Sequence, residues 1–419
     1  MNKVRLGDVC ISITDGEHGS PNNDPKGTCW FLNNNNLTSS GIVINPNDRR
    51  ISEKTFQQIR RRTHLAQGDV LIATCGTLGK TCIVRENPSN LEFSRSVGII
   101  KPDRDKLNER YLHYFFTLPS TQKRIQKIAT GGVQKHFYIA DMEDFLIYLP
   151  SMSTQKAIAS LLGTIDDKIA LNKKLCAELE ETAQLIYDYW FTQFDFPDES
   201  GNPYRSSGGK MVYNETLKRE IPEGWKEGAL SDLAAITMGQ SPVGSTYNRM
   251  GLGVPFFQGR ADFTELFPAE ITYTTAPTRM AAEDDILLSV RAPIGDLNLS
   301  ITRCCIGRGL AAIRDKHESP LFIYCTLNNH AARLSRAHED GTTFGAVDKE
   351  GLSELACAIP PTSLLDSFRN SVSGIYSQLK DLEQQKRHLT ALRDWLLPML
   401  MNGQVKPGNT PEDVTEVHV

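Results

Sequence analysis

The chain has 419 residues, 40% of them hydrophobic and 23% charged, and its formal net charge is −4. This composition is typical of a globular protein with room for two or three domains, and it argues against a uniformly basic protein that coats DNA. The nine cysteines include no Cys-x-x-Cys pair, and the sequence has no run of about 18 apolar residues, so we expect a cytoplasmic protein without a disulfide framework or a membrane span.

Residues 1–152 are predicted to form a mixed domain with more strand than helix. Short apolar runs bounded by turn residues predict buried strands at 69–74, 82–84 and 97–100. Residues 111–116 and 120–128 predict a helix or a helix pair. We therefore expect an α+β unit with a twisted sheet.

A heptad pattern predicts one long helix over residues 153–194, within a helical segment that extends to residue 196. Its apolar seam includes Leu162, Ile165, Ile169, Leu179 and Ile186. The polar Asn172 also falls on the seam, where it would fix the register, and an Asn172 that faces the surface is the alternative. A proline precedes the helix and another follows it. At about 1.5 Å per residue the helix would be roughly 60 Å long, and its one-sided seam requires a partner helix.

The chain supplies that partner itself, in a second helix over residues 363–402. Val372, Ile375, Leu379 and Leu382 repeat the seam at an offset of 210 residues, and each helix follows an apolar–proline step. We predict that the two helices pack together in antiparallel fashion. Lys386 and Arg393 interrupt the seam, which predicts weaker packing towards the end of the second helix.

The repeat extends beyond the helices. The matched stretches are 4–9 with 228–233, 67–71 with 283–287, 78–79 with 294–295, and 94–98 with 307–311. The second copy is predicted to contain strands at 286–290, 301–305 and 310–313, and a helix or helix pair over 321–328 and 331–338. The predicted organisation is domain 1–152, helix 153–196, connector 197–222, domain 223–362, helix 363–402 and tail 403–419.

Polar and basic loop residues of the first domain are candidates for contact with DNA. Basic side chains neutralise phosphates, and asparagine pairs bidentately with adenine in the major groove. The candidates are Asn33, Asn34, Asn35, Arg60, Arg61, Lys80, Arg95, Gln134, Lys135 and His136. Turn chemistry for the asparagines and a solvated helix face for the arginines are equally open.

Comparable loops occur in the second domain. Arginine suits either guanine or a phosphate, and the glycine-containing loops expose polar side chains. The candidates are Gln240, Ser241, Gln258, Arg260, Arg291, Arg308, Thr342 and Thr343. Ordinary surface turns are the alternative for each.

Catalysis within this chain is not expected. Residues 76–81 resemble a phosphate loop, but the position of its first glycine is Thr74. Residues 307–312 fit Gly-x-Gly-x-x-Ala without a clear first strand of a βαβ unit, and no Asn-Pro-Pro-aromatic tetrapeptide of an adenine methyltransferase occurs. The histidines and cysteines are scattered, so we expect no metal and no cofactor.

Several of these motifs carry a resemblance to a known family. The stretch Ile221-Pro222-Glu223-Gly224-Trp225, the aromatic stretch 188–197 and the two proline steps with their long helices are typical of it. Over about residues 4–405 the chain resembles the specificity subunits of type I restriction–modification systems, the HsdS family.

The resemblance implies a non-catalytic subunit that binds double-stranded DNA. Two target recognition domains, related by a pseudo-two-fold axis and joined by two antiparallel coiled-coil helices, would each recognise one half of a split asymmetric site. Two methyltransferase subunits and restriction (translocase) subunits would be the partners. The alternative is a coiled-coil scaffold that binds proteins without reading DNA, and the salt dependence of DNA binding distinguishes the two.

Overall fold

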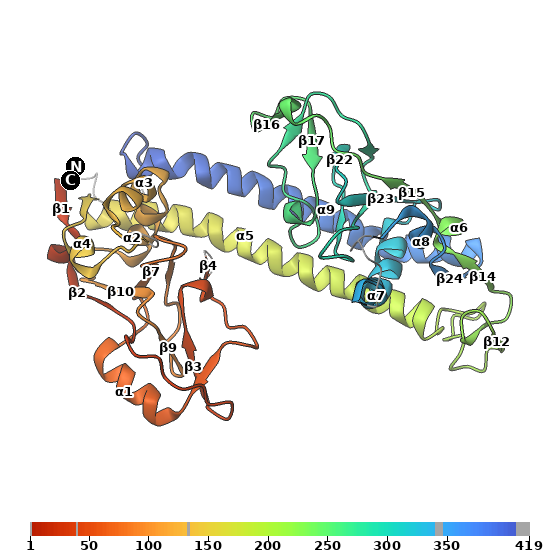
Figure 1. The fold of residues 1–419 in the computed structure, drawn as a ribbon, viewed down its shortest axis with the longest axis horizontal. Helices are drawn as coiled ribbons and strands as arrows, with labels where there is room; N and C mark the ends of the chain where they lie inside the picture. Colours follow the sequence, from red (N-terminus) through yellow and green to blue (C-terminus); the bar gives the residue numbers. More distant parts are fainter. Residues whose placement is uncertain (1, 39–40, 132–134, 340–346, 408–419) are drawn as a thin grey trace, which may run out of the picture. The chain divides into compact units, whose positions relative to one another are not determined.

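The computed structural model describes residues 2–38, 41–131, 135–339 and 347–407 (Figure 1). The chain divides into two compact units. The first comprises residues 1–171 together with 386–419, and the second comprises residues 172–385. Each unit is described by itself below.

The strands of the first unit match the predicted α+β domain. They are β1 Asn2–Arg5, β2 Cys10–Asp15, β3 Cys29–Leu32, β4 Leu37–Thr38, β5 Gly41–Ile42, β6 Arg49–Ile51, β7 Val70–Ala73, β8 Thr81–Ile83, β9 Leu91–Phe93, β10 Val97–Pro102 and β11 Leu146–Leu149. One antiparallel sheet has the order β2-β10-β7-β8, and a second has the order β6-β3-β9, in which β3 and β9 are parallel. The strands predicted at 69–74, 82–84 and 97–100 are confirmed as β7, β8 and β10.

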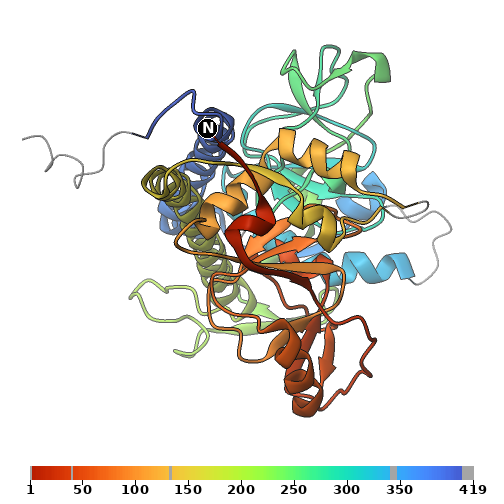
Figure 2. The same cartoon turned by 90° about the vertical axis from the view of Figure 1, so that its left-hand side faces the viewer.

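The helices of the first unit begin at polar capping residues where the sequence supplies them. They are η1 Leu6–Val9, η2 Asn34–Asn36, α1 Glu53–Thr63, α2 Glu109–Thr117, α3 Pro119–Ile128 and α4 Ile139–Glu143. Ser52 Oγ accepts the Thr55 N–H at the start of α1, and Asn108 Oδ1 accepts the Tyr111 N–H at the start of α2. The predicted pair of helices is confirmed as α2 and α3. Figures 1 and 2 show α1 beside β3 and β9, apart from α2 and α3.

The four-stranded sheet of the first unit is buried on both faces. Val70 and Ile72 of β7 pack in one cluster with α2 residues such as Phe115, whereas Leu71 and Ala73 pack in another with residues of β3 and β9. Because side chains alternate between the faces of a strand, a doubly covered strand needs apolar residues at every position. This explains the uninterrupted apolar run of β7.

The second unit repeats this plan. Its strands are β12 Met211–Asn214, β13 Arg219–Pro222, β14 Lys226–Ala229, β15 Ala234–Met238, β16 Tyr247–Asn248, β17 Val254–Phe257, β18 Tyr273–Thr274, β19 Met280–Ala281, β20 Ile286–Ser289, β21 Leu297–Leu299, β22 Cys304–Ile306, β23 Leu310–Asp315 and β24 Ala356–Ile359. Its short helices are α6 Leu230–Leu233, η4 Gly244–Thr246, η5 Arg260–Asp262 and α8 Lys349–Ser353, and its longer helix is α7 Pro320–Glu339.

The sheet topology confirms the internal repeat. The order β15-β23-β20-β21 reproduces β2-β10-β7-β8, the pair β14-β24 reproduces β1-β11, and the parallel pair β17-β22 reproduces β3-β9. The antiparallel neighbour of the parallel pair is also repeated, because β18 pairs with β17 as β6 pairs with β3. The second sheet of the second unit is larger, since β16 and β19 extend it to the order β16-β18-β17-β22-β19. The strand predicted at 301–305 begins three residues late, at Cys304, and the helical segments predicted at 321–328 and 331–338 form one helix, α7.

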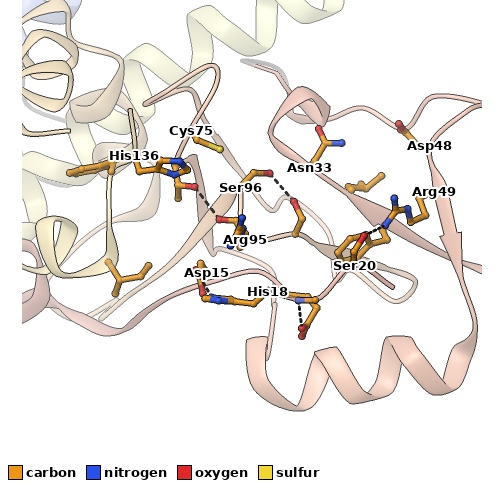
Figure 3. A pocket seen from close by; sticks show the side chains of 18 of the residues that line it. Asp15, His18, Ser20, Asn33, Asp48, Arg49, Cys75, Arg95, Ser96 and His136 are labelled. Carbon is orange, nitrogen blue, oxygen red and sulfur yellow. Dashed lines mark hydrogen bonds and ion pairs between the residues drawn. The ribbon is translucent and has the colours of Figure 1, made fainter. Parts of the chain in front are cut away.

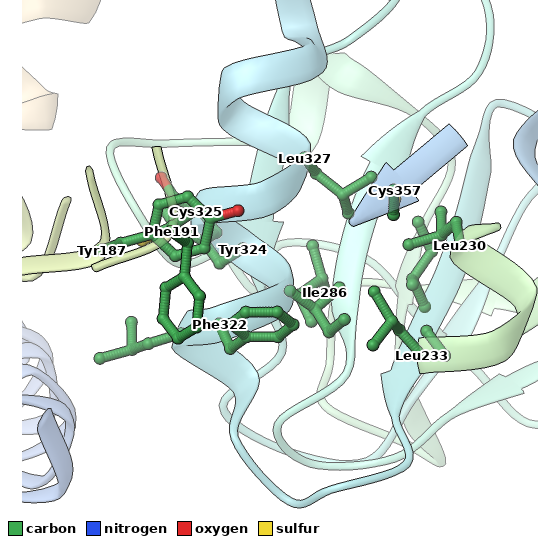
Figure 4. Close-up of a cluster of buried hydrophobic side chains, with 14 of the residues drawn as sticks. Tyr187, Phe191, Leu230, Leu233, Ile286, Phe322, Tyr324, Cys325, Leu327 and Cys357 are labelled. Carbon is green, nitrogen blue, oxygen red and sulfur yellow. The ribbon is translucent and has the colours of Figure 1, made fainter. Parts of the chain in front are cut away.

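The main core of the second unit joins α7 to its four-stranded sheet and to the long helices (Figure 4). Ile286 and Leu288 of β20 face this cluster, whereas Leu287 faces a second one. The Tyr187 hydroxyl lies 3.0 Å from the Thr326 hydroxyl, which satisfies both polar groups within the apolar surroundings.

The two long helices are confirmed as α5 Met152–Tyr187, continued by the π-helical turn η3 Asp188–Thr192, and α9 Thr362–Met401. In the first unit, Arg393 donates to Asp166 at 3.0 Å. In the second unit, Asn172 Nδ2 donates to Gln385 Oε1 at 3.3 Å, and the Trp190 and Phe368 rings are 5.8 Å apart. Within the second unit, residue numbers rise along α5 as they fall along α9, so the two segments are antiparallel.

Burial differs along the predicted seam. Leu162, Ile165, Val372 and Leu379 are buried, and the part-buried positions are Ile169, Leu179, Ile186, Ile375 and Leu382. The expectation that Arg393 weakens the packing at its end of α9 was wrong. Its guanidinium is paired with Asp166, and Leu397 and Leu400 beyond it are buried in the same cluster as Leu162.

Candidate nucleic-acid interface

The first unit contains a cleft of about 1060 Å³ at the ends of several strands (Figure 3). The side chains at its wall come from the ends of β2, β3 and β9, from β6, and from the segment before α4. They include Asp15, His18, Asn33, Arg49, Arg95 and His136. The cleft thus brings together three predicted residues, Asn33, Arg95 and His136, that are far apart in the sequence.

An ion-pair network holds the loop after β2 at one rim of the cleft. His18 Nε2 lies 2.9 Å from the Asp15 carboxylate, and Arg62 donates to the Asp15 carbonyl at 3.0 Å. Glu17 Oε1 accepts the Gly19 N–H at 2.8 Å. None of the DNA contacts predicted from the sequence lies on this rim. The signal in the sequence was Gly16, which follows β2 as Gly239 follows β15.

The asparagine run after β3 combines turn chemistry with exposed amides. Asn33 Oδ1 accepts the Asn35 N–H at 2.8 Å and caps η2, while Asn36 is buried and bonded to the Val43 carbonyl at 2.9 Å. Asn34 Nδ2 lies 3.4 Å from the Thr77 hydroxyl, and Asn35 is exposed. The amide groups available to a ligand are therefore the Nδ2 of Asn33 and the whole side chain of Asn35.

Some of the predicted basic residues of the first unit interact with neighbouring residues, and others are exposed at the surface. Arg60 is largely buried, forms an ion pair with Glu92, and donates to three backbone carbonyl groups. Lys135 Nζ donates to the Gln126 carbonyl at 3.0 Å, and the His136 ring stacks on Tyr138 with centroids 5.7 Å apart. Arg61, Lys80 and Arg95 are exposed, and Gln134 lies outside the described residues.

Candidates of the second unit lie at corresponding strand ends. Ser241 Oγ accepts from Gln258 Nε2 at 3.1 Å and from the Arg308 N–H at 3.2 Å, so these three residues form one connected group. Arg260 is paired with Asp296. Gln240 and Arg291 are exposed, whereas Thr342 and Thr343 lie outside the described residues.

Two buried ionisable groups of the first unit, Glu92 and His113, do not line the cleft. Burial raises the pKa of Glu92, although Arg60 and the Thr63 hydroxyl favour its charged form. Burial lowers the pKa of His113 to about 4, and its Nδ1 has no hydrogen-bond partner among the described residues. The perturbed groups thus belong to the scaffold, and their positions do not indicate acid–base chemistry.

In the part of the chain that the structure describes, none of the helices combines the length and the apolar character that a membrane span requires. No group of three or more His, Cys, Asp and Glu side chains there could hold a metal ion.

Comparisons with known proteins place these features in a family. The family model for the type I restriction modification DNA specificity domain matches residues 1–181 and 222–367. A putative type I restriction enzyme MjaX specificity subunit of Methanocaldococcus jannaschii is 27% identical over 362 residues, covering 84% of this chain and 82% of the relative. The HindI specificity subunit of Haemophilus influenzae is 22% identical over 404 residues, covering 81% of this chain and 87% of the relative.

A solved structure has the same fold. The crystal structure of a type I restriction–modification S subunit from M. genitalium aligns with a TM-score of 0.58 at 16% identity, covering 98% of this chain and 96% of that chain. The family model matches the two stretches that contain the repeated sheets and the first parts of both long helices. The chain therefore belongs to the family of type I restriction–modification DNA specificity subunits.

Proposed function

We propose that this chain is the non-catalytic subunit that reads a two-part, asymmetric DNA sequence for a type I restriction–modification enzyme. Each unit recognises one half-site through the side chains at the ends of its repeated sheets. In the first unit these side chains surround the cleft, and in the second unit they include the group formed by Ser241, Gln258 and Arg308.

One observation carries this proposal: the same sheet topology occurs twice and ends in different side chains. The parallel pair β3-β9 leads to Asn33, whereas β17-β22 leads to Gln258 at the corresponding position. Readers of two different half-sites need a common scaffold and different recognition groups. A bipartite and asymmetric site follows from these differences.

The long helices are proposed as the spacer between half-sites. Both α5 and α9 continue from one unit into the other, and we assign them as an antiparallel coiled coil around a pseudo-two-fold axis. In this assignment the target recognition domains are 1–152 and 223–362, the helices are 153–196 and 363–402, the connector is 197–222 and the tail is 403–419. The partners are duplex DNA, two methyltransferase subunits and restriction subunits.

The test is the adenine methylation pattern of a methylation-free bacterial host that expresses this chain with the methyltransferase encoded beside it. The expected result is a split asymmetric motif that is absent without this chain. Replacing residues 1–150 by the same segment of another family member should change one half of the motif only. No motif from an assembled complex, together with DNA binding that does not depend on salt, would favour the protein-binding scaffold instead.

A further inference from the structure

The same set of backbone hydrogen bonds surrounds one turn in each unit: the β9–β10 turn in the first and the β22–β23 turn in the second. In the first unit a backbone N–H donates to a backbone carbonyl in six residue pairs. With the donor named first, they are Gly16 to Val97 (2.9 Å), Glu17 to Phe93 (2.7 Å), Ser94 to Leu32 (2.9 Å), Val97 to Ser94 (3.0 Å), Thr74 to Ser96 (2.9 Å) and Phe137 to Thr74 (2.9 Å). In the second unit the counterparts, in the same order, are Gly239 to Leu310 (2.9 Å), Gln240 to Ile306 (3.0 Å), Gly307 to Phe257 (2.8 Å), Leu310 to Gly307 (3.0 Å), Val290 to Gly309 (2.9 Å) and Val347 to Val290 (3.0 Å).

Glycine is required at one position of each turn for the same steric reason. A Cβ atom on Gly16 would lie 2.3 Å from the Ser94 carbonyl oxygen, and one on Gly239 would lie 2.1 Å from the Gly307 carbonyl oxygen. Ser94 and Gly307 occupy corresponding positions in the hydrogen-bond pattern. The close approach of the two segments therefore holds both turns in the same backbone arrangement.

The central residue of each turn is arginine: Arg95 in Ser-Arg-Ser and Arg308 in Gly-Arg-Gly. Both side chains are exposed, and neither guanidinium has a hydrogen bond or ion pair with any residue that the structure describes. Figure 3 shows Arg95 among the side chains of the cleft, between His136 and Asn33 in that view. Each unit thus has an exposed guanidinium group at the same position of its turn, and neither group forms a hydrogen bond or ion pair with a described residue.

The neighbouring positions differ between the units. Glu17 corresponds to Gln240, and Asn33 to Gln258. Among these corresponding positions, the two units therefore have the same residue only at the obligatory glycine and at the arginine. A shared residue suits a feature that every DNA half-site has, which is the phosphate backbone, whereas the differing residues suit bases that differ.

We infer that Arg95 and Arg308 are equivalent phosphate contacts that position the duplex on each unit, independently of the bases there. This inference rests on the proposed function and assigns a role within it. A guanidinium donates two hydrogen bonds to one phosphate and displaces condensed counterions. The neighbouring Asn33 and Gln258 are then held against base edges.

The test uses the full-length chain in complex with its methyltransferase subunits and measures duplex binding across a series of salt concentrations. Arg95→Ala and Arg308→Ala should each weaken binding roughly 10- to 100-fold for specific and unrelated duplexes alike. Each should reduce the slope of log affinity against log salt by about 0.9. Lysine at either position should restore the salt slope, since it keeps the charge at a phosphate, but only part of the affinity, because an ammonium group cannot reproduce both guanidinium hydrogen bonds.

Matched controls remove a cation elsewhere. Arg303 is exposed at the opposite end of β22 from Arg308, and Lys54 is exposed on α1 of the first unit. Arg303→Ala and Lys54→Ala should leave affinity and slope unchanged. Thermal unfolding should give the same midpoint for all variants, because both arginine side chains are exposed and form no hydrogen bond or ion pair with the residues that the structure describes.

The outcomes separate this inference from the proposed function. If the unmodified complex binds DNA without sequence preference or salt dependence, the proposed function fails. If it binds specifically but the alanine variants match the controls, the phosphate assignment is wrong. The assignment is also wrong if Arg95→Ala retains affinity but relaxes one base of the methylated motif, since that result identifies a guanine contact. It is likewise wrong if lysine fails to restore the salt slope, since a charge at a phosphate would restore it.

Discussion

Replacing Arg60 by alanine should destabilise the first unit rather than weaken DNA binding. The Glu92 carboxylate is fully buried, and its partners are the Arg60 guanidinium, the Thr63 hydroxyl at 2.9 Å and the Phe93 backbone N–H. Arg60 also donates to the Leu65 and Pro88 carbonyl groups at 3.1 and 2.6 Å. Removing one partner of a buried ion pair leaves an uncompensated charge, which costs about 3–5 kcal/mol of the free energy of unfolding.

The pH dependence of this loss has a definite sign. Burial already raises the pKa of Glu92 above its ordinary value of 4.5, and Arg60 opposes that shift. Without Arg60 the pKa of the folded state rises further above that of the unfolded state. The stability of Arg60→Ala therefore falls as pH rises between those two pKa values, and the deficit relative to the unmodified chain should be smaller at pH 5 than at pH 8.

The assay is urea unfolding of the full-length chain at both pH values. Hydrogen-exchange mass spectrometry of peptides that cover β9 should localise the change. Arg61→Ala is the control, because Arg61 is the next residue and is exposed, and it should change the free energy of unfolding by less than about 0.5 kcal/mol. Adding Glu92→Gln to Arg60→Ala should recover much of the loss, since no buried charge remains.

The opposite result would refute this argument. Arg60→Ala could prove as stable as Arg61→Ala while DNA affinity and its salt slope both fall. Arg60 would then contact phosphate, as the sequence alone allowed, and the ion pair with Glu92 would be incidental.

Three further predictions concern the scaffold. Burial lowers the pKa of His113 from 6.5 to about 4, so the free energy of unfolding should fall by up to about 3 kcal/mol as the pH drops from 6.5 to 4. Acid unfolding of His113→Phe should not show this contribution to the pH dependence. Gly16→Ala should cost about 1–3 kcal/mol in thermal unfolding through its clash with backbone carbonyl groups, whereas Gly244→Ala, with open space around it, should be neutral. Leu162→Ala should cost about 2–5 kcal/mol, and Leu161→Ala on the same helix far less, because Leu162 is fully buried and Leu161 is 38% exposed; equal losses would contradict the packing.

The positions of the candidate DNA contacts could be predicted only in part. The internal repeat predicts that Arg95 and Arg308 occupy matched positions, and the hydrogen-bond pattern agrees. The neighbouring Arg60 and Arg61 look alike in sequence, but Arg60 is largely buried and Arg61 is exposed. Arg60 faces Glu92 because α1 packs beside β9, a contact between segments about 30 residues apart. Exposure of a cation depends on such packing, and no local pattern encodes it.

The spacing of apolar residues and the positions of prolines and turn residues predicted the long helices and the buried strands of this protein. The matched stretches of sequence predicted its internal repeat. A heptad seam or an apolar run records which face of an element is buried, and a proline precedes the start of each long helix, although Pro398 lies inside α9. Tertiary structure alone decided which strand ends meet at the cleft, that Arg393 pairs with Asp166, and that β16 and β19 extend the second sheet of the second unit. These features depend on contacts between residues far apart in the chain, and local hydrophobic spacing carries no record of them.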